Sequence, residues 1–122
     1  MSRQMKTPGP GHPITVEKDP SRVTVRVGDQ VVADTTAALV LRESNYPPVH
    51  YVPLADVDPA SIAPTATSTY CPFKGDASYY ALVTRDGEFA DAVWTYREPY
   101  PAVAEIAGHV AFYADKVEIT RS

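Results

Sequence analysis

The feature that most constrains the fold of this chain is a set of short runs in which apolar and polar residues alternate, interrupted by Pro and Gly. In residues 22–27 (RVTVRV), three valines share one face of an extended chain, while Thr24 and Arg26 share the other. The 122 residues include 12 Pro and 6 Gly, and both residue types are unfavourable inside a helix. The pattern therefore predicts short antiparallel strands connected by turns.

We expect roughly eight to ten short strands and one short helix, which together predict a mainly β fold of the tent-like, half-barrel or sandwich type. Residues 37–43 are also compatible with a helical turn, but their position between strands favours a strand. The expected strands are residues 14–18, 22–27, 30–34, 37–43, 49–53, 65–69, 77–84, 89–96, 110–113 and 117–120.

Two segments have the signals of helical structure. Asp58 is a good capping residue, and Pro59 suits the first helical position, so a single turn is expected there. The only longer helix is expected near residues 101–107, with Pro101 at its start and Gly108 as its stop signal.

The length predicts one small domain of residues 14–122, preceded by an irregular N-terminal arm of residues 1–13. Prolines on both sides of residues 49–53 indicate an edge strand, because each proline removes a hydrogen-bond donor. Residues 110–113 and 117–120 are expected to pair with each other as the last two strands.

Composition argues against several classes of protein. A net charge of -4 and a pI near 5.2 do not suit nucleic-acid binding, which depends on neutralising phosphates. No run approaches the roughly 20 apolar residues of a membrane helix, and the N-terminus lacks the apolar stretch of a signal peptide. One cysteine cannot form an internal disulfide, which fits a reducing compartment. We expect a cytoplasmic domain with no nucleic-acid or membrane partner.

The segment of residues 67–80 (TSTYCPFKGDASYY) contains the only cysteine and is the best candidate for a site. A catalytic thiol needs a neighbouring base or cation, and Lys74 lies three residues after Cys71. The alternative is that Cys71 is a small buried apolar residue. Lys74 with Gly75 lacks the upstream glycines of a phosphate loop, although the lysine could meet an anion as a point charge.

Aromatic residues are numerous enough to form a pocket as well as a core. Trp94 and Tyr96 share one face of a predicted strand, and alignment with Tyr79 or Tyr80 would produce an aromatic wall with polar tips. The same tyrosines could instead pack a thin sandwich. We predict that one concave ligand-binding site combines Tyr51, Cys71, Lys74, Ser78, Tyr80, Trp94 and Tyr96.

No metal or cofactor site is expected. His12, His50 and His109 lie in separate segments without the spacing of metal ligands, and one cysteine cannot complete a usual zinc site. No serine lies in the Gly-x-Ser-x-Gly pattern of a serine hydrolase.

Four ordered motifs give the chain a family resemblance. They are residues 46–58 (YPPVHYVPLADVD), 69–80 (TYCPFKGDASYY), 92–101 (AVWTYREPYP) and 109–119 (HVAFYADKVEI). They resemble the bacterial family called domain of unknown function 427. The resemblance implies a tent-like β fold of the kind found in methionine sulfoxide reductase B. Some related folds hold zinc through two Cys-x-x-Cys pairs, whereas this chain has only Cys71. A label attached to the family suggests nucleotidyltransferase activity.

Two hypotheses of function remain open at the level of sequence. The first is a module that binds a small neutral or anionic molecule through Lys74 and the tyrosines. The alternative is an enzyme that uses Cys71 as a nucleophile or redox centre, or that has the nucleotidyltransferase activity suggested by the family label. A homodimer is also compatible with the sequence.

Overall fold

The computed structural model describes residues 4–122 and contains ten strands and three short 3-10 helices in this part of the chain. The strands are β1 (Ile14–Asp19), β2 (Val23–Val27), β3 (Gln30–Thr35), β4 (Ala38–Glu43), β5 (Val49–Pro53), β6 (Ile62–Cys71), β7 (Gly75–Thr84), β8 (Gly87–Thr95), β9 (His109–Phe112) and β10 (Glu118–Arg121). Seven strands form an antiparallel sheet in the order β1-β4-β5-β9-β8-β7-β6, and the others form a second sheet in the order β10-β2-β3. The mainly β fold predicted from the sequence is confirmed, and the larger sheet is open, with β1 and β6 at its edges.

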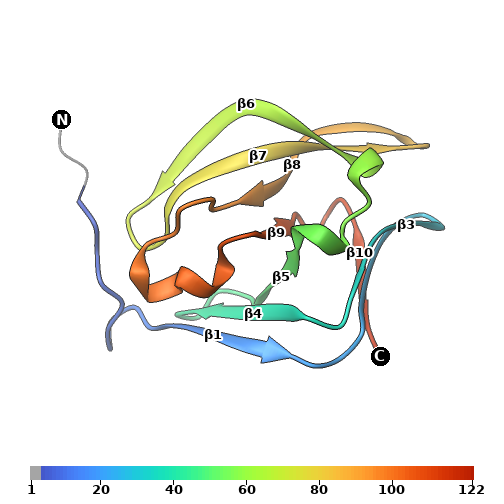
Figure 1. Cartoon of the computed structure of the whole chain (residues 1–122). Helices are drawn as coiled ribbons and strands as arrows, with labels where there is room; N and C mark the ends of the chain where they lie inside the picture. The colour runs from blue at the N-terminus through green and yellow to red at the C-terminus, as the bar shows by residue number, and fades with distance from the viewer. Residues whose placement is uncertain (1–3) are drawn as a thin grey trace.

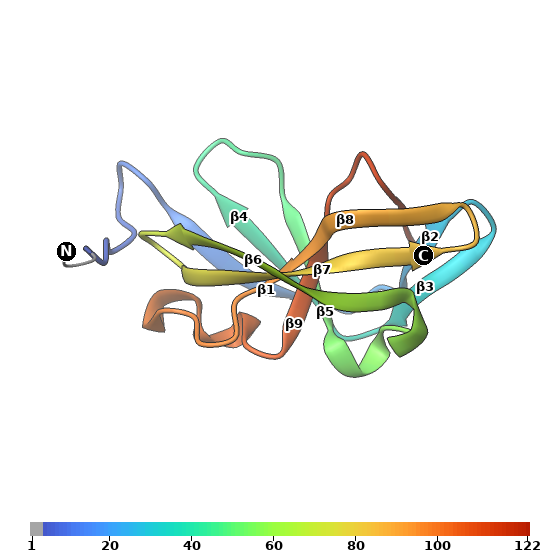
Figure 2. The same ribbon diagram turned by 90° about the horizontal axis from the view of Figure 1, so that it is seen from above.

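The seven-stranded sheet is bent so that its two ends face each other (Figure 1). In this view β6, β7 and β8 form an upper layer, β1 and β4 form a lower layer, and β5 and β9 run between them. The turn between β2 and β3 lies at the same end of the molecule as the turn between β7 and β8 (Figure 2). There the backbone N–H of Arg85 donates a hydrogen bond of 3.0 Å to the side-chain oxygen of Gln30.

The bent sheet has a hydrophobic core on each face, because successive residues of a strand point to opposite sides. In the first core, Val25 of the small sheet packs with Leu82 of the large sheet. The second core lies inside the bend and includes Leu39. Strand β5 contributes to both, since Tyr51 belongs to the second core and Val52 to the first.

The helix predicted near residues 101–107 is present as the 3-10 helix η3 (Pro101–Ile106), which is interrupted at Val103. Val103 and Ile106 are fully buried in the second core. These two buried side chains hold η3 against the core. Within residues 4–122, no helix has the length and apolar character needed to cross a bilayer.

The single turn predicted after Asp58 is also present, as η2 (Pro59–Ser61). The carboxylate of Asp58 accepts a hydrogen bond of 3.0 Å from the backbone N–H of Ala60, and Pro59 occupies the first helical position. A further short helix, η1 (Leu54–Asp56), follows β5 directly.

The prediction that the last two strands pair with each other is wrong. Strand β9 lies between β5 and β8, whereas β10 pairs with β2 in the smaller sheet, where Ile119 is opposite Val25. Two contacts favour this position for β10. Ile119 packs against the first core, and the guanidinium of Arg121 donates hydrogen bonds of 2.7 and 3.1 Å to Asp19.

The expectation that residues 49–53 form an edge strand is also wrong, because β5 lies inside the large sheet between β4 and β9. Pro53 is the last residue of the strand, so its missing N–H interrupts no later part of the ladder. The pairing of β5 with β9 is nevertheless very short, being limited to Val52 with Val110 and Pro53 with His109. This short pairing determines where the candidate site lies.

Candidate ligand-binding site

Strands β5 and β9 separate soon after they pair, and the space between them is a cleft. On its other side, β5 pairs with β4 from Val49 to Tyr51, so this half of β5 is held in place without β9. Continuing the β5–β9 register would place His50 opposite Phe112, and both of these residues line the cleft instead. The cleft has a volume of about 360 Å³. It is lined by Glu43, Tyr46, Pro47, Pro48, Val49, His50, Trp94, Phe112, Tyr113, Ala114 and Ile119.

Aromatic side chains form one wall and part of the mouth of the cleft. The rings of Trp94 and Tyr113 lie 4.7 Å apart between centroids and are tilted by 51°. The indole N–H of Trp94 donates a hydrogen bond of 3.2 Å to the hydroxyl of Tyr51. At the mouth, Tyr46 and Tyr113 expose 62% and 44% of their surface, which is large for aromatic residues.

A charged cluster closes one end of the cleft, with Glu43 at its centre. One carboxylate oxygen of Glu43 accepts a hydrogen bond from the ammonium of Lys74, and the other lies 2.7 Å from Nε2 of His12. His12 stacks on Phe73 with ring centroids 4.1 Å apart, and the Lys74 ammonium lies 6.0 Å from the ring centroid of Tyr96. Burial acts to raise the pKa of Glu43, but the hydrogen bonds from Lys74 and His12 outweigh it and lower the pKa. Glu43 is therefore ionised at neutral pH.

His50 on the other wall is oriented by a buried carboxylate. Its Nε2 lies 3.2 Å from Asp19, which also accepts the two hydrogen bonds from Arg121. These hydrogen bonds from Arg121 outweigh burial and hold the pKa of Asp19 well below its usual range. Because an ionised carboxylate can only accept, the proton of the neutral His50 ring is on Nε2, and Nδ1 is its acceptor.

The structure brings five of the seven predicted site residues to the same face of the large sheet. Tyr51 and Tyr96 belong to the second core, and Cys71 and Trp94 pack against it. Lys74 reaches over the ring of Tyr96. Tyr51 and Tyr96 are only 1% and 7% exposed, so they support the site from within the core. Among the seven, Trp94 is the residue that lines the cleft directly.

Ser78 and Tyr80 are not brought to this face. In the observed register Tyr79 is opposite Trp94, whereas Ser78 is opposite Thr95. Tyr80 consequently packs against the first core. Tyr79, one of the two tyrosines considered for an aromatic wall, is therefore the one that shares a face with Trp94.

Several residues of the cleft were not identified from the sequence, notably Glu43, Tyr46 and Tyr113. Glu43 and Lys74 are 31 residues apart, and no local spacing indicates that they form an ion pair. The one available signal was the run of Tyr46 and two prolines before β5, which is typical of an exposed, stiff loop. Lys74 was expected to meet an anionic ligand as a point charge. In the structure its charge is already balanced by Glu43.

Residues 15–122 match the model of a family described as a domain of unknown function (DUF427), and the chain therefore belongs to this family. The resemblance inferred from the four sequence motifs is confirmed. A comparison with curated proteins finds no match. Among residues 4–122, no group of three or more His, Cys, Asp and Glu side chains is arranged to hold a metal ion.

Proposed function

We propose that this domain binds a small neutral molecule with a planar, aromatic body in the cleft between β5 and β9. The observation that carries the proposal is the early separation of these strands, which leaves Trp94 and Tyr113 beside an open space within a sheet. The volume of about 360 Å³ lies at the small end of the range of roughly 300–1,000 Å³ for ligand pockets, which favours a ligand of one or two rings.

The preference for a neutral ligand follows from the charges around the cleft. Glu43 is paired with Lys74, and His50 is hydrogen-bonded to Asp19, which is paired with Arg121. Each carboxylate thus has its own cation, and a charged ligand would lose hydration without gaining an unpaired partner. Lys74 provides no free charge for an anion, so we favour the neutral ligand over the anionic one.

Recognition would combine ring contacts with hydrogen bonds. Trp94 and Tyr113 offer ring surfaces for an aromatic ligand, and the hydroxyl groups of Tyr46 and Tyr113 can donate or accept. Glu43 uses one hydrogen bond on each oxygen, and a carboxylate has further lone pairs that could accept a hydrogen bond from a ligand amide or hydroxyl.

Fluorescence of Trp94, the only tryptophan in the chain, provides the test. The protein is titrated with benzamide, benzoate and benzylamine, which share a ring and differ in charge. We expect benzamide to change the emission in a saturable way and to bind more tightly than either charged compound. Equal responses to all three compounds, or no saturable response to benzamide, would contradict the proposal.

Two variants separate the cleft from unspecific contact with aromatic compounds. Tyr113→Ala removes a ring of the wall and is expected to weaken benzamide binding roughly 3- to 10-fold, the equivalent of an aromatic contact of about 0.5–1.5 kcal/mol. Leu54→Ala is the matched control, because Leu54 is 40% exposed and lies outside the cleft. Its affinity for benzamide should equal that of the unaltered protein.

A further inference from the structure

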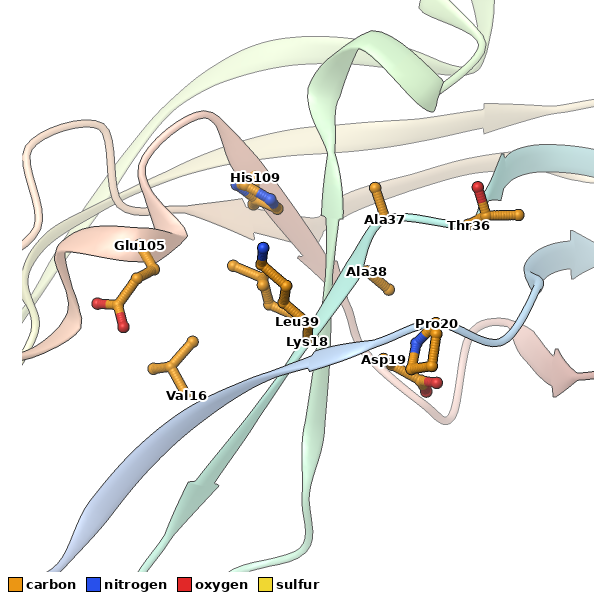
Figure 3. A pocket seen from close by; sticks show the side chains of 10 residues that line it. All are labelled: Val16, Lys18, Asp19, Pro20, Thr36, Ala37, Ala38, Leu39, Glu105 and His109. Atoms are coloured by element: carbon orange, nitrogen blue, oxygen red, sulfur yellow. The ribbon is translucent and has the colours of Figure 1, made fainter.

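A second hollow of about 580 Å³ lies between strands β1 and β4 on one side and helix η3 with the start of β9 on the other (Figure 3). It shares no lining residue with the cleft between β5 and β9. Its apolar surface includes Val16, Ala38 and Leu39. Ala38 and Leu39 of β4 are buried and Val16 of β1 is half-buried, so the apolar part of the hollow is formed by side chains that are packed on paired strands.

Four ionisable side chains line this hollow. One of them, Asp19, is already paired with Arg121 and His50, and the other three come from three different elements. Lys18 comes from β1, Glu105 from η3 and His109 from the first position of β9 (Figure 3). Within residues 4–122, neither Lys18 nor Glu105 has an ion-pair partner or a side-chain hydrogen bond. Apart from Asp19, whose charge is balanced by Arg121, the hollow therefore presents one positive and one negative group that do not neutralise each other, unlike the paired charges of the cleft.

The orientation of His109 is fixed by its own backbone. Its Nδ1 lies 2.9 Å from the carbonyl oxygen of Ala107. A carbonyl only accepts, so Nδ1 carries the proton, and Nε2 is the acceptor of the neutral ring. The hollow thus contains an ammonium donor, a carboxylate acceptor and an imidazole acceptor around an apolar patch.

We propose that this hollow binds a small zwitterion with an apolar body, of the class of the aliphatic α-amino acids. The ligand carboxylate would pair with Lys18, and the ligand ammonium would donate to Glu105 and to Nε2 of His109. The aliphatic group would lie on Val16 and Leu39. A simple anion would meet the repulsion of Glu105, and a simple cation that of Lys18, so a ligand with both charges complements the site best.

Binding is expected to be weak, with a dissociation constant on the order of millimolar, because Lys18 and Glu105 are exposed and exposed ion pairs contribute little. Amide chemical shifts in NMR spectra detect binding in this range and report its location. The protein is titrated with L-leucine, with 4-methylpentanoate, which lacks the ammonium, and with 3-methylbutylamine, which lacks the carboxylate. We expect leucine to shift the amides of Lys18, Glu105 and His109, and each single-charge analogue to bind about 2- to 5-fold more weakly, as the loss of one exposed ion pair implies.

Charge variants test the assignment of each contact. Lys18→Glu and Glu105→Lys should each weaken the response to leucine, whereas the double variant, with the charges exchanged, should restore part of it, because the reversed ligand regains both ion pairs but not the hydrogen bond to Nε2 of His109. Glu88→Lys is the matched control, because Glu88 is exposed and lies outside the hollow. The spectra themselves report that each variant is folded. Equal binding of the three compounds, shifts confined to other parts of the molecule, or no rescue in the double variant would overturn the proposal.

Discussion

The indole N–H of Trp94 in β8 donates a hydrogen bond of 3.2 Å to the hydroxyl of Tyr51 in β5. The two strands are not neighbours in the sheet, since β9 lies between them, yet the side chains meet where β5 and β9 separate. Burial raises the pKa of Tyr51 to about 12, although the hydrogen bond from Trp94 partly opposes this. The Tyr51 hydroxyl therefore stays neutral and links β5 to Trp94, which lines the cleft.

Removing this hydrogen bond should loosen the cleft with a small loss of stability. Tyr51→Phe keeps the ring in the second core and removes the acceptor for the Trp94 N–H. We expect the free energy of unfolding to fall by about 0.5–1.5 kcal/mol in urea denaturation. Tyr46→Phe is the control, because that hydroxyl belongs to an exposed residue, and it should change stability very little. Equal losses in both variants would show that the Trp94–Tyr51 bond has no special role.

The ion pair between Lys74 and Glu43 should stabilise the fold in a pH-dependent way. The folded-state pKa of Glu43 is lowered from its ordinary value of 4.5, so its contribution is present above that pH and is lost as the pH falls through the folded pKa. Lys74→Met leaves a carboxylate that is only 14% exposed with His12 as its partner. We expect a loss of about 1–3 kcal/mol at pH 7.

The measurement is denaturation of the unaltered protein, Lys74→Met and Glu43→Gln at pH 7 and below pH 4. The gap between the unaltered protein and Lys74→Met should shrink at the lower pH, because Glu43 is increasingly protonated as the pH falls towards its lowered folded-state pKa. Lys116→Met is the matched control, since its weak contact with Asp115 is exposed. A gap that stays constant with pH would contradict the role assigned to Glu43.

Arg121 is predicted to hold the end of the chain in place through Asp19. Its hydrogen bonds are the largest cause of the low pKa of Asp19, so the associated stability is fully present above the ordinary value of 3.8 and is lost progressively as the pH falls below it towards the folded pKa. Arg121→Met should lower the free energy of unfolding near neutral pH, because it leaves the buried Asp19 carboxylate without its main hydrogen-bond donor. It should also move the onset of acid unfolding to higher pH. An unchanged acid midpoint in circular dichroism would contradict this.

Folding is predicted to need no stoichiometric zinc, because one cysteine and three dispersed histidines do not supply a usual closed site. Elemental analysis of the purified protein should find less than one zinc per chain. Its melting temperature should not change in EDTA. One bound zinc per chain together with a large loss of stability in the chelator would prove this prediction wrong.

The sequence predicted the elements well and their long-range arrangement less well. Period-two alternation and turn residues are local, and they located the strands and the helix near Pro101. The pairing of β10 with β2 depends on packing of Ile119 and on the Asp19–Arg121 pair, whose members are 102 residues apart. Local patterns contain no information on such a contact.

Only part of the candidate site was predicted from the sequence, because its geometry also depends on long-range contacts. The strand register decides which side chains share a face of the sheet. Tyr79, and not Tyr80, is opposite Trp94, and a shift of one residue would have placed Tyr80 on that face instead. The cleft itself forms because β5 and β9 stop pairing after two residue pairs, and no residue type in the sequence indicates where strand pairing ends. Trp94, Cys71 and Lys74 were identified because they are chemically distinctive, whereas Glu43 and Tyr113 resembled ordinary surface residues.

A crystal of the protein soaked in benzamide would show whether the cleft between β5 and β9 binds a neutral aromatic molecule. We expect density for the ring against Trp94 and Tyr113, with the amide group directed towards Glu43. Density for benzamide only at other surfaces, or strands β5 and β9 paired along their whole length so that no cleft remains, would contradict it.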